Sequence, residues 1–364
     1  MRVHVSRAER SLKIEKELVV MTGNRIKRKE YLRFARNFKP EEVQLIQEFE
    51  EWLPKKIVDC HAHCCLPEHI TEINDEIFHL PLSSFPGFNI EESKEWKKIM
   101  YPGKEIISLR FSLPFPGIDY KEVNNYLLSN VSQLDKVAIF GSPDDVEYTI
   151  KMLMSSNTSA FKSYPLFSKN NLASIYDYFP KEVLYVAEEK EIPIILHLPK
   201  KITDCCDQVS KIANDFPCLK ICIAHLGLEK KISQGLIKVF SKIEKYENIF
   251  CDTSLISSSE VIGAAIDVFG AERIMYGSDE PLNLLRFVIY EHPVLGDRLV
   301  TDYLYHWVNL KEHLQFKHLA FNAVHSHWSS LLGIRKAVEK TPLDEREGIK
   351  QKIFYNNAKN FFCL

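Results

Sequence analysis

Six residues whose side chains bind metals lie at or just past the ends of short apolar runs. They are Asp59, His61, His63, His197, His225 and Asp279. Runs such as Ile192–Leu196 and Ile221–Ala224 have the length and composition of buried parallel strands. In an α/β barrel, polar side chains just past the strands gather at one rim, where such barrels build their sites. The spacing therefore predicts a metal-ligating cluster at the carboxyl rim of a barrel.

The first pair of histidines sets the chemistry of this cluster. Residues two apart on a strand point to the same side, so His61 and His63 can offer neutral imidazole nitrogens to one cation. Asp59 faces the same way one layer deeper, and we interpret it as an acceptor that fixes an imidazole tautomer. His197 adds a third nitrogen, and Asp279 adds a carboxylate oxygen. This donor set suits one divalent ion, with Zn²⁺ favoured over Mn²⁺ or Fe²⁺, and leaves a position for water.

Eight strand-like runs could position these residues. They are Ile57–Asp59, Ile106–Leu109, Val137–Phe140, Ala160–Tyr164, Ile192–His197, Lys220–His225, Ile249–Asp252 and Ile274–Gly277. Helical patterns lie between most of them, and eightfold alternation of this kind predicts an α/β fold, a (β/α)8 TIM barrel over residues 56–364. The segment Pro281–Lys340, after the eighth strand, is expected to be a helical insertion. Together with Cys64–Gly103, it would lie over the barrel mouth and shape the pocket.

The N-terminal residues 1–55 are expected to form a helical extension packed on the barrel. Within them, the apolar spacing of Pro40–Leu53 is typical of an amphipathic helix that begins at the proline. Residues 1–39 hold twelve Lys/Arg against four Glu. We interpret this basic bias as a solvated helical face, with a targeting segment or a contact to an anionic partner as alternatives.

The overall composition limits the classes of function. The chain has 364 residues, of which 45% are hydrophobic, and a net charge of −2, so no global field attracts nucleic acid or a membrane. No run of about 18 apolar residues predicts a membrane-spanning helix. The nine cysteines do not resemble a disulfide framework, which favours a reducing, cytoplasmic setting. We therefore expect a small-molecule substrate as the partner, and we allow for a homodimer.

Five segments together resemble a known family. They are Val58–His63, Ile195–His197, Ala224–Gly227, Tyr276–Asp279 and the closing segment Ile353–Phe362 with its Asn-Ala pair. They are similar to motifs of the amidohydrolase superfamily, in the branch of aminocarboxymuconate-semialdehyde decarboxylase-like and other TIM-barrel metal-dependent hydrolases. The resemblance covers roughly residues 56–364.

That resemblance implies roles for the cluster. His61, His63, His197 and Asp279 would hold the metal, and His225 would hydrogen-bond the bound water or the substrate oxygen. Asp279 would also move a proton from that water to the leaving group. The implied activity is hydrolysis of an amide, ester or lactone bond in a small, anionic substrate. Non-oxidative decarboxylation at the same single metal is the alternative, and a barrel that binds metal and ligand without turnover is a third reading.

Three further residues are candidates for contact with the substrate. Lys162 and Tyr164 end the fourth strand, and Arg110 ends the second. We expect Lys162 to bind an anionic group, although a carbamylated lysine that bridges a second metal and an ordinary ion pair are alternatives. For Arg110, a carboxylate of the substrate and a salt bridge at the rim are both compatible with the sequence.

A second His-x-His motif and two cysteine pairs are predicted to have no metal. His325 and His327 fall in Leu319–Val338, whose spacing is helical, and residues two apart on a helix diverge by roughly 200°. We expect packed or surface roles for both. Cys64-Cys65 and Cys205-Cys206 match no zinc-binding spacing, and we expect buried or loop thiols there.

Overall fold

Eight parallel strands in sequence order form the central sheet of the computed structural model, which describes residues 35–73, 78–114, 116–155, 157–167 and 174–364. The strands are β1 (Lys56–His63), β2 (Glu105–Phe111), β3 (Lys136–Phe140), β4 (Thr158–Ser163), β5 (Ile194–Leu196), β6 (Ile221–Ile223), β7 (Ile249–Asp252) and β8 (Ile274–Met275). Backbone bonds then link the segment after β8 to β1. One joins Cys60 N to Tyr276 O at 3.0 Å, and another joins His63 N to Glu280 O at 2.7 Å. The predicted barrel is confirmed.

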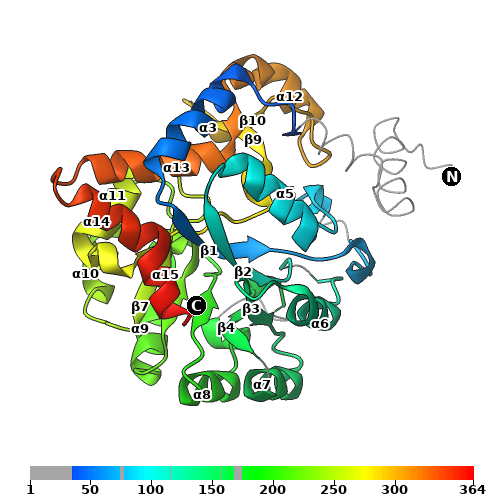
Figure 1. Cartoon of the computed structure of the whole chain (residues 1–364), viewed down its shortest axis with the longest axis vertical. Helices are drawn as coiled ribbons and strands as arrows, with labels where there is room; N and C mark the ends of the chain where they lie inside the picture. The colour runs from blue at the N-terminus through cyan, green and yellow to red at the C-terminus, as the bar shows by residue number, and fades with distance from the viewer. Residues whose placement is uncertain (1–34, 74–77, 115, 156, 168–173) are drawn as a thin grey trace.

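Helices cover the outside of this ring (Figure 1). Those between the strands are α5 (Ile90–Met100), α6 (Tyr120–Asn130), α7 (Val146–Ser155), α8 (Lys181–Glu189), α9 (Ile202–Asp215), α10 (Gln234–Ile243) and α11 (Ser259–Phe269), and α14 (Arg346–Gln351) and α15 (Asn357–Phe361) end the chain. Side-chain caps fix several starts. Asp119 accepts a hydrogen bond from Glu122 N at 3.1 Å, and Ser233 accepts one from Leu236 N, also at 3.1 Å.

The period of two along each strand divides the core into an inner and an outer part. In β5, Ile195 points into the barrel, where it packs in one cluster with Val58, Cys222 and Met275. Its neighbours Ile194 and Leu196 belong to the larger cluster between strands and helices. The strands are thus buried on both faces, which explains why their sequences are continuously apolar rather than alternating.

The insertion after β8 differs from the helical prediction. It contains an antiparallel sheet of β9 (Arg286–His292), β10 (Gly296–Thr301) and β11 (Val324–His325), in the order β10-β9-β11. Only α12 (Leu310–Phe316) and α13 (Ser326–Glu339) are α-helical. The β-branched and aromatic residues of β9 favour a strand, and Gly296, at φ +71°, allows the tight return into β10.

The helix α3 (Pro40–Trp52) packs against this insertion (Figure 1). Phe49 stacks on Trp328 of α13 with ring centroids 6.0 Å apart. The buried carboxylate of Glu42 lies 2.6 Å from the guanidinium of Arg286 and 2.5 Å from Nδ1 of His325. The helix predicted at Pro40–Leu53 is confirmed. The rest of the predicted extension, up to residue 34, lies outside the described residues.

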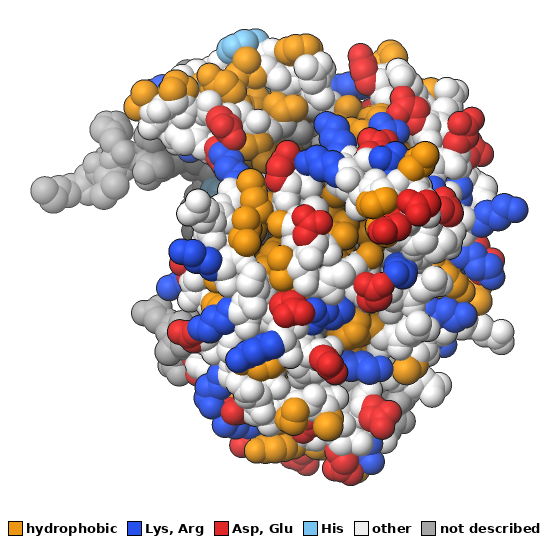
Figure 2. All heavy atoms as spheres, turned by 90° about the vertical axis from the view of Figure 1, so that its left-hand side faces the viewer, with side chains coloured by type: hydrophobic (Ala, Val, Ile, Leu, Met, Phe, Trp, Pro, Cys, Tyr) orange, Lys and Arg blue, Asp and Glu red, His pale blue; other side chains and the backbone are white. Residues whose placement is uncertain are grey.

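The outer surface mixes charge and apolar groups. Figure 2 shows basic and acidic side chains interspersed over one face, with small apolar patches between them. In the described part of the chain, no helix combines the length and the apolar character needed to cross a membrane. All nine cysteines are free thiols, as predicted.

Candidate metal centre

Three of the predicted ligands meet at the carboxyl rim of the barrel. His61 and His63 end β1, and Oδ1 of Asp279 lies 3.2 Å from Nε2 of each. The three potential ligand atoms lie within 4.8 Å of one another, and all three residues are buried. Side chains more than two hundred residues apart in the sequence thus converge as the strand pattern predicts.

A strained segment after β8 carries Asp279 to this point. Asp279 has a φ of +58°, in the left-handed region, and its N–H donates to His61 O at 2.8 Å. The preceding Gly277 approaches β1 so closely that a Cβ there would lie 2.7 Å from Cβ of His61. The glycine before the aspartate is therefore needed for the close contact between β8 and β1.

Each of the four rim histidines has its Nδ1 beside a fixed acceptor. The Nδ1 partners are Asp252 Oδ2 for His61 at 2.9 Å, Ser112 O for His63 at 2.8 Å, Leu198 O for His197 at 2.9 Å and Ser254 O for His225 at 3.0 Å. These acceptors assign the proton to Nδ1, which leaves Nε2 with its lone pair. Four imidazoles are thus set in the tautomer that ligates through Nε2.

Burial also favours the neutral form of His61, His63 and His197. It lowers the pKa of His61 to about 4, and the charge of Lys162 adds to that effect. The pKa of His63 is lowered by burial, and that of His197 falls well below its ordinary value for the same reason. Neutral imidazole is the form that binds a metal ion, so the site does not have to lose protons at neutral pH.

The donor set fits a divalent cation. Nε2 of His61, Nε2 of His63 and Oδ1 of Asp279 all present lone pairs to one another at short range. Within the described ranges, Oδ1 of Asp279 accepts no hydrogen bond, although it is fully buried. A buried carboxylate oxygen without a donor is unfavourable, and a cation shared with the two imidazole nitrogens removes that cost. The cluster is therefore a divalent-metal site with nitrogen and oxygen ligands.

The fourth predicted ligand, His197, lies beside this cluster rather than within it. Its Nε2 is 3.0 Å from the hydroxyl of Tyr164, which donates to it, and the two rings lie 4.2 Å apart. Its ring centroid is 5.1 Å from that of His225. The structure thus brings together three of the four predicted ligands and pairs the fourth with a predicted substrate contact.

An unusual backbone turn presents His225 to the same rim. His225, Leu226 and Gly227 follow β6 with φ values of +56°, +46° and +73°. Successive non-glycine residues in this region are strained by roughly 1–2 kcal/mol each. The N–H of His225 donates to Asp252 Oδ1 at 2.8 Å, which offsets part of that cost. With Nδ1 held by Ser254, His225 offers an acceptor at Nε2.

The role predicted for Asp59 was wrong, and Asp252 has it instead. Asp59 is buried, but its carboxylate accepts hydrogen bonds from Lys97 Nζ at 2.8 Å and from Ser278 N at 2.8 Å. It therefore holds the loop that carries Asp279. Asp252, at the end of β7, contacts His61 Nδ1. The sequence does contain a signal for Asp252, because it is a polar residue at the end of a predicted strand, as the predicted rim residues are.

Lys162 and Arg110 differ in where they point. The side chain of Lys162 is buried, and its Nζ lies 3.0 Å from Nε2 of His61 and 4.2 Å from the ring centroid of Phe111. Burial lowers the pKa of Lys162 to about 8. Arg110 points away from the rim, where its Nε donates to Asp135 at 2.9 Å. The predicted substrate contact of Arg110 was wrong, because its neighbours Leu109 and Phe111 face the barrel interior and Arg110 therefore faces the helices. The alternative, an ion pair, is the one found, although it is buried.

The second His-x-His motif also differs in its backbone. His325 lies in β11, and His327 lies in the first turn of α13, so the predicted single helix was wrong at this point. Both side chains are buried, His325 beside Glu42 and His327 against Trp328 with ring centroids 4.5 Å apart. Their expected packed roles are confirmed. Among the described residues, the potential metal cluster at the rim does not include them.

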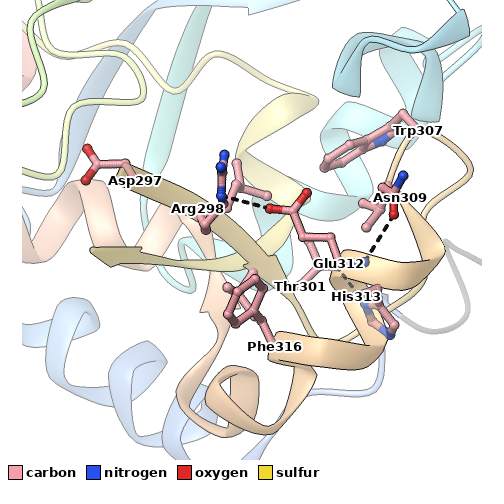
Figure 3. A pocket seen from close by; sticks show the side chains of 11 residues that line it. Asp297, Arg298, Thr301, Trp307, Asn309, Glu312, His313 and Phe316 are labelled. Atoms are coloured by element: carbon pink, nitrogen blue, oxygen red, sulfur yellow. Dashed lines mark hydrogen bonds and ion pairs between the residues drawn. The ribbon is translucent and has the colours of Figure 1, made fainter. Parts of the chain in front are cut away.

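A cavity of about 360 Å³ opens onto the metal site. Its polar end includes His63, Tyr164, His197, His225 and Asp279. A second hollow, of about 290 Å³, lies between β10 and α12 (Figure 3). Its charged groups already have partners, since Arg298 lies 3.2 Å from Glu312 and Asp297 lies 2.9 Å from Lys231. The first cavity is therefore the candidate substrate pocket.

Comparisons with known proteins agree with this geometry. The family model described as "Amidohydrolase" matches residues 136–364, which is more than half of the chain. The chain belongs to the amidohydrolase family. Among curated proteins, none matches the sequence significantly.

Solved structures show that other amidohydrolases share this fold at low identity. Amidohydrolase 2 from Bifidobacterium longum subsp. infantis is 15% identical with a TM-score of 0.51, covering 85% of this chain and 100% of that chain. A zinc-bound amidohydrolase from Burkholderia multivorans is 10% identical with a TM-score of 0.54, covering 85% and 99%. A manganese complex of 5-carboxyvanillate decarboxylase from Novosphingobium aromaticivorans is 12% identical with a TM-score of 0.52, covering 85% and 96%.

Proposed function

We propose that this amidohydrolase hydrolyses an amide, ester or lactone bond of a small, carboxylate-bearing molecule. The observation that carries the proposal is the convergence of His61 Nε2, His63 Nε2 and Asp279 Oδ1 where a cavity of about 360 Å³ meets the rim. His197 remains our fourth proposed ligand. A single divalent ion held there would act as a Lewis acid and make hydroxide available near neutral pH.

The surrounding side chains fit the proton movements that hydrolysis needs. The carboxylate of Asp279 can take a proton from the attacking water and return it to the leaving group. His225 offers Nε2 as an acceptor, so it can orient that water or a substrate hydroxyl. The buried ammonium of Lys162 can stabilise negative charge that develops on the attacked carbonyl.

We propose zinc as the ion. Imidazole nitrogens of His61, His63 and His197 with one carboxylate oxygen of Asp279 form the kind of nitrogen-rich set that zinc prefers. The Burkholderia multivorans relative was solved with bound zinc, and the Novosphingobium aromaticivorans relative with manganese. Metal analysis of the purified chain should find about one ion per chain, whereas two would favour a site bridged through Lys162.

The test compares the wild-type chain with Asp279→Asn and a matched buried control, Asp135→Asn. The zinc-loaded proteins are assayed on lactones, esters and N-acyl amides that carry one carboxylate, in ¹⁸O-labelled water. We expect the wild-type product to carry the label and Asp279→Asn to be inactive with an unchanged circular dichroism spectrum. Full activity in Asp279→Asn, or no turnover of any compound by the wild type, would contradict the proposal. The second result would favour a barrel that binds without turnover.

Decarboxylation is the second candidate function. The ammonium of Lys162 lies 3.0 Å from Nε2 of His61, and a fixed positive charge there suits a substrate whose carboxylate is the reacting group. One neighbour with this fold is the 5-carboxyvanillate decarboxylase of Sphingomonas paucimobilis. Release of carbon dioxide from an aromatic acid, with no ¹⁸O in the organic product, would identify this reaction instead.

A further inference from the structure

We propose that the substrate is amphiphilic, with one polar reacting end and an apolar body that lies against the sheet β10-β9-β11. The wall that receives this body is formed by Phe287, Ile289 and Leu299, and we call it the apolar wall. The inference rests on the proposed function for the place of the reacting end. It adds the class of substrate: a monocarboxylate, or a derivative of one, with a medium-length alkyl chain or an aryl group.

The register of the sheet gives it two distinct faces. Phe287 and Ile289 are two apart on β9, so they share one face, and Ile289 lies directly opposite Leu299 on β10. All three line the cavity. The other face carries Val300, which packs with Phe316 in a separate core cluster, and Figure 3 shows Phe316 of α12 beside β10. The sheet is therefore anchored on one face and open to the cavity on the other.

The exposure of the two faces differs in the way that a ligand-binding wall requires. Val300 and Phe316 on the anchored face are only 4% and 6% exposed. Ile289 and Leu299 are 43% and 38% exposed although both line the cavity. Apolar area that borders a cavity gains free energy when an apolar ligand removes it from water. Phe287 packs in part against the main core, whereas Ile289 and Leu299 leave apolar area that a ligand body can cover.

The remaining lining residues extend this apolar character. Leucines of the loops after β1 and β8, such as Leu82 and Leu285, also line the cavity. Away from the rim, its polar lining consists of the hydroxyls of four serines and one exposed lysine, Lys230. A second carboxylate deep in the substrate would therefore lack a buried counter-charge. The same cavity reaches His63 and Asp279 at its other end, so one ligand can occupy both parts.

Binding of straight-chain alkanoates tests the inference without any need for turnover. The zinc-loaded protein is titrated with acetate through decanoate by isothermal calorimetry. We expect the dissociation constant to fall by about fourfold per added methylene, and then to level off when the chain fills the cavity. Dicarboxylates of equal length should bind at least tenfold more weakly. Affinity that does not depend on chain length, or no binding of decanoate, overturns the inference.

A double variant and a matched control locate the effect. Ile289→Thr with Leu299→Thr places a β-branched side chain, which strands favour, at both positions while it removes apolar area. We expect its affinity for octanoate to fall roughly tenfold, with acetate binding unchanged. Val294→Thr makes the same kind of change at the hairpin turn, where Val294 is 84% exposed and does not line the cavity. That control should bind both acids as the wild type does.

The outcomes also separate this inference from its alternatives. If the double variant dissociates a dimer in sedimentation while the chain-length dependence persists, the apolar wall is an interface between copies and the inference fails. If chain-length dependence is present and lost in the double variant, but no compound is hydrolysed, the proposed function fails and the apolar subsite stands. Equal behaviour of the double variant and Val294→Thr would contradict the assigned wall.

Discussion

Replacement of Asp252 by asparagine should weaken metal binding although Asp252 is not a predicted ligand. Its Oδ2 lies 2.9 Å from Nδ1 of His61, and its Oδ1 accepts from the N–H of His225 at 2.8 Å and from the N–H of Ser254 at 3.1 Å. An amide can keep its oxygen toward the two backbone donors. Its NH₂ group then faces Nδ1 of His61, so two donors oppose each other.

The expected loss of metal affinity follows from the tautomer of His61. His61 can accept from the new amide only if its proton moves to Nε2, and that form cannot ligate through Nε2. Otherwise the hydrogen bond from His61 to a charged acceptor is lost, which is worth about 1.5–3 kcal/mol. Loss of such an outer partner typically costs about 10–100-fold in metal affinity. We therefore expect the zinc dissociation constant of Asp252→Asn to rise by about that factor.

A zinc titration against a chromophoric chelator at neutral pH measures this effect. Asp135→Asn is the matched control, because Asp135 is also a buried carboxylate at the end of a hydrogen-bond network but pairs with Arg110 instead of an imidazole. The control should lose folding stability while its zinc affinity stays within about threefold of the wild type. Zinc affinity of Asp252→Asn equal to that of the control would refute the tautomer argument.

Three further predictions concern stability and the pocket. Lys97→Met should lower the free energy of unfolding by about 3–5 kcal/mol in urea titrations, because it leaves buried carboxylates unpaired. Lys94→Met, on the exposed face of the same helix, should change it by less than about 1 kcal/mol. Gly333→Ala should raise KM, because a Cβ there would lie 2.6 Å from the backbone oxygen of Ser257, which lines the cavity. Gly263→Ala has open space around the new Cβ, so it should leave the free energy of unfolding unchanged or raise it by up to about 1 kcal/mol. Burial raises the pKa of Glu42, but hydrogen bonding and charge from its histidine partner outweigh this and lower it to about 2. Stability should therefore fall as the pH drops from about 4.5 toward 2, and Glu42→Gln should flatten that fall in unfolding titrations at each pH.

The sequence was most informative where one periodicity governs the structure. Runs such as Ile192–Leu196 have no other stable place than a buried parallel strand, and a polar residue after each must lie at the rim. For that reason, His61, His63 and Asp279 were brought together correctly. His225 and His197 were also placed at the rim, but their exact contacts depend on the turn after β6 and on Tyr164, which have no signature at the level of spacing.

The sequence was least informative where tertiary contacts, rather than local spacing, determine which side a residue faces or which element forms. The pairing of β1 with β2 is irregular between Asp59 and Ala62, and the extra residue in β1 changes which side Asp59 faces relative to His61 and His63. The hairpin of Arg286–Thr301 has a sequence signal in the β-branched and aromatic run Phe287–Tyr290 and in Gly296 at the turn. That short run does not alternate between polar and apolar residues, so its local pattern is also compatible with a helix.

The contact between Glu42 and Arg286 has a consequence for synthesis of the chain. The two residues are 244 positions apart, and His325 follows still later. At a translation speed of roughly 5–20 residues per second, the carboxylate of Glu42 leaves the ribosome about 12–50 s before its arginine partner. During that interval, Glu42 lacks both its arginine and its histidine partner. Because Arg286 and His325 follow β8 in the chain, this buried contact can form only after all eight barrel strands have left the ribosome.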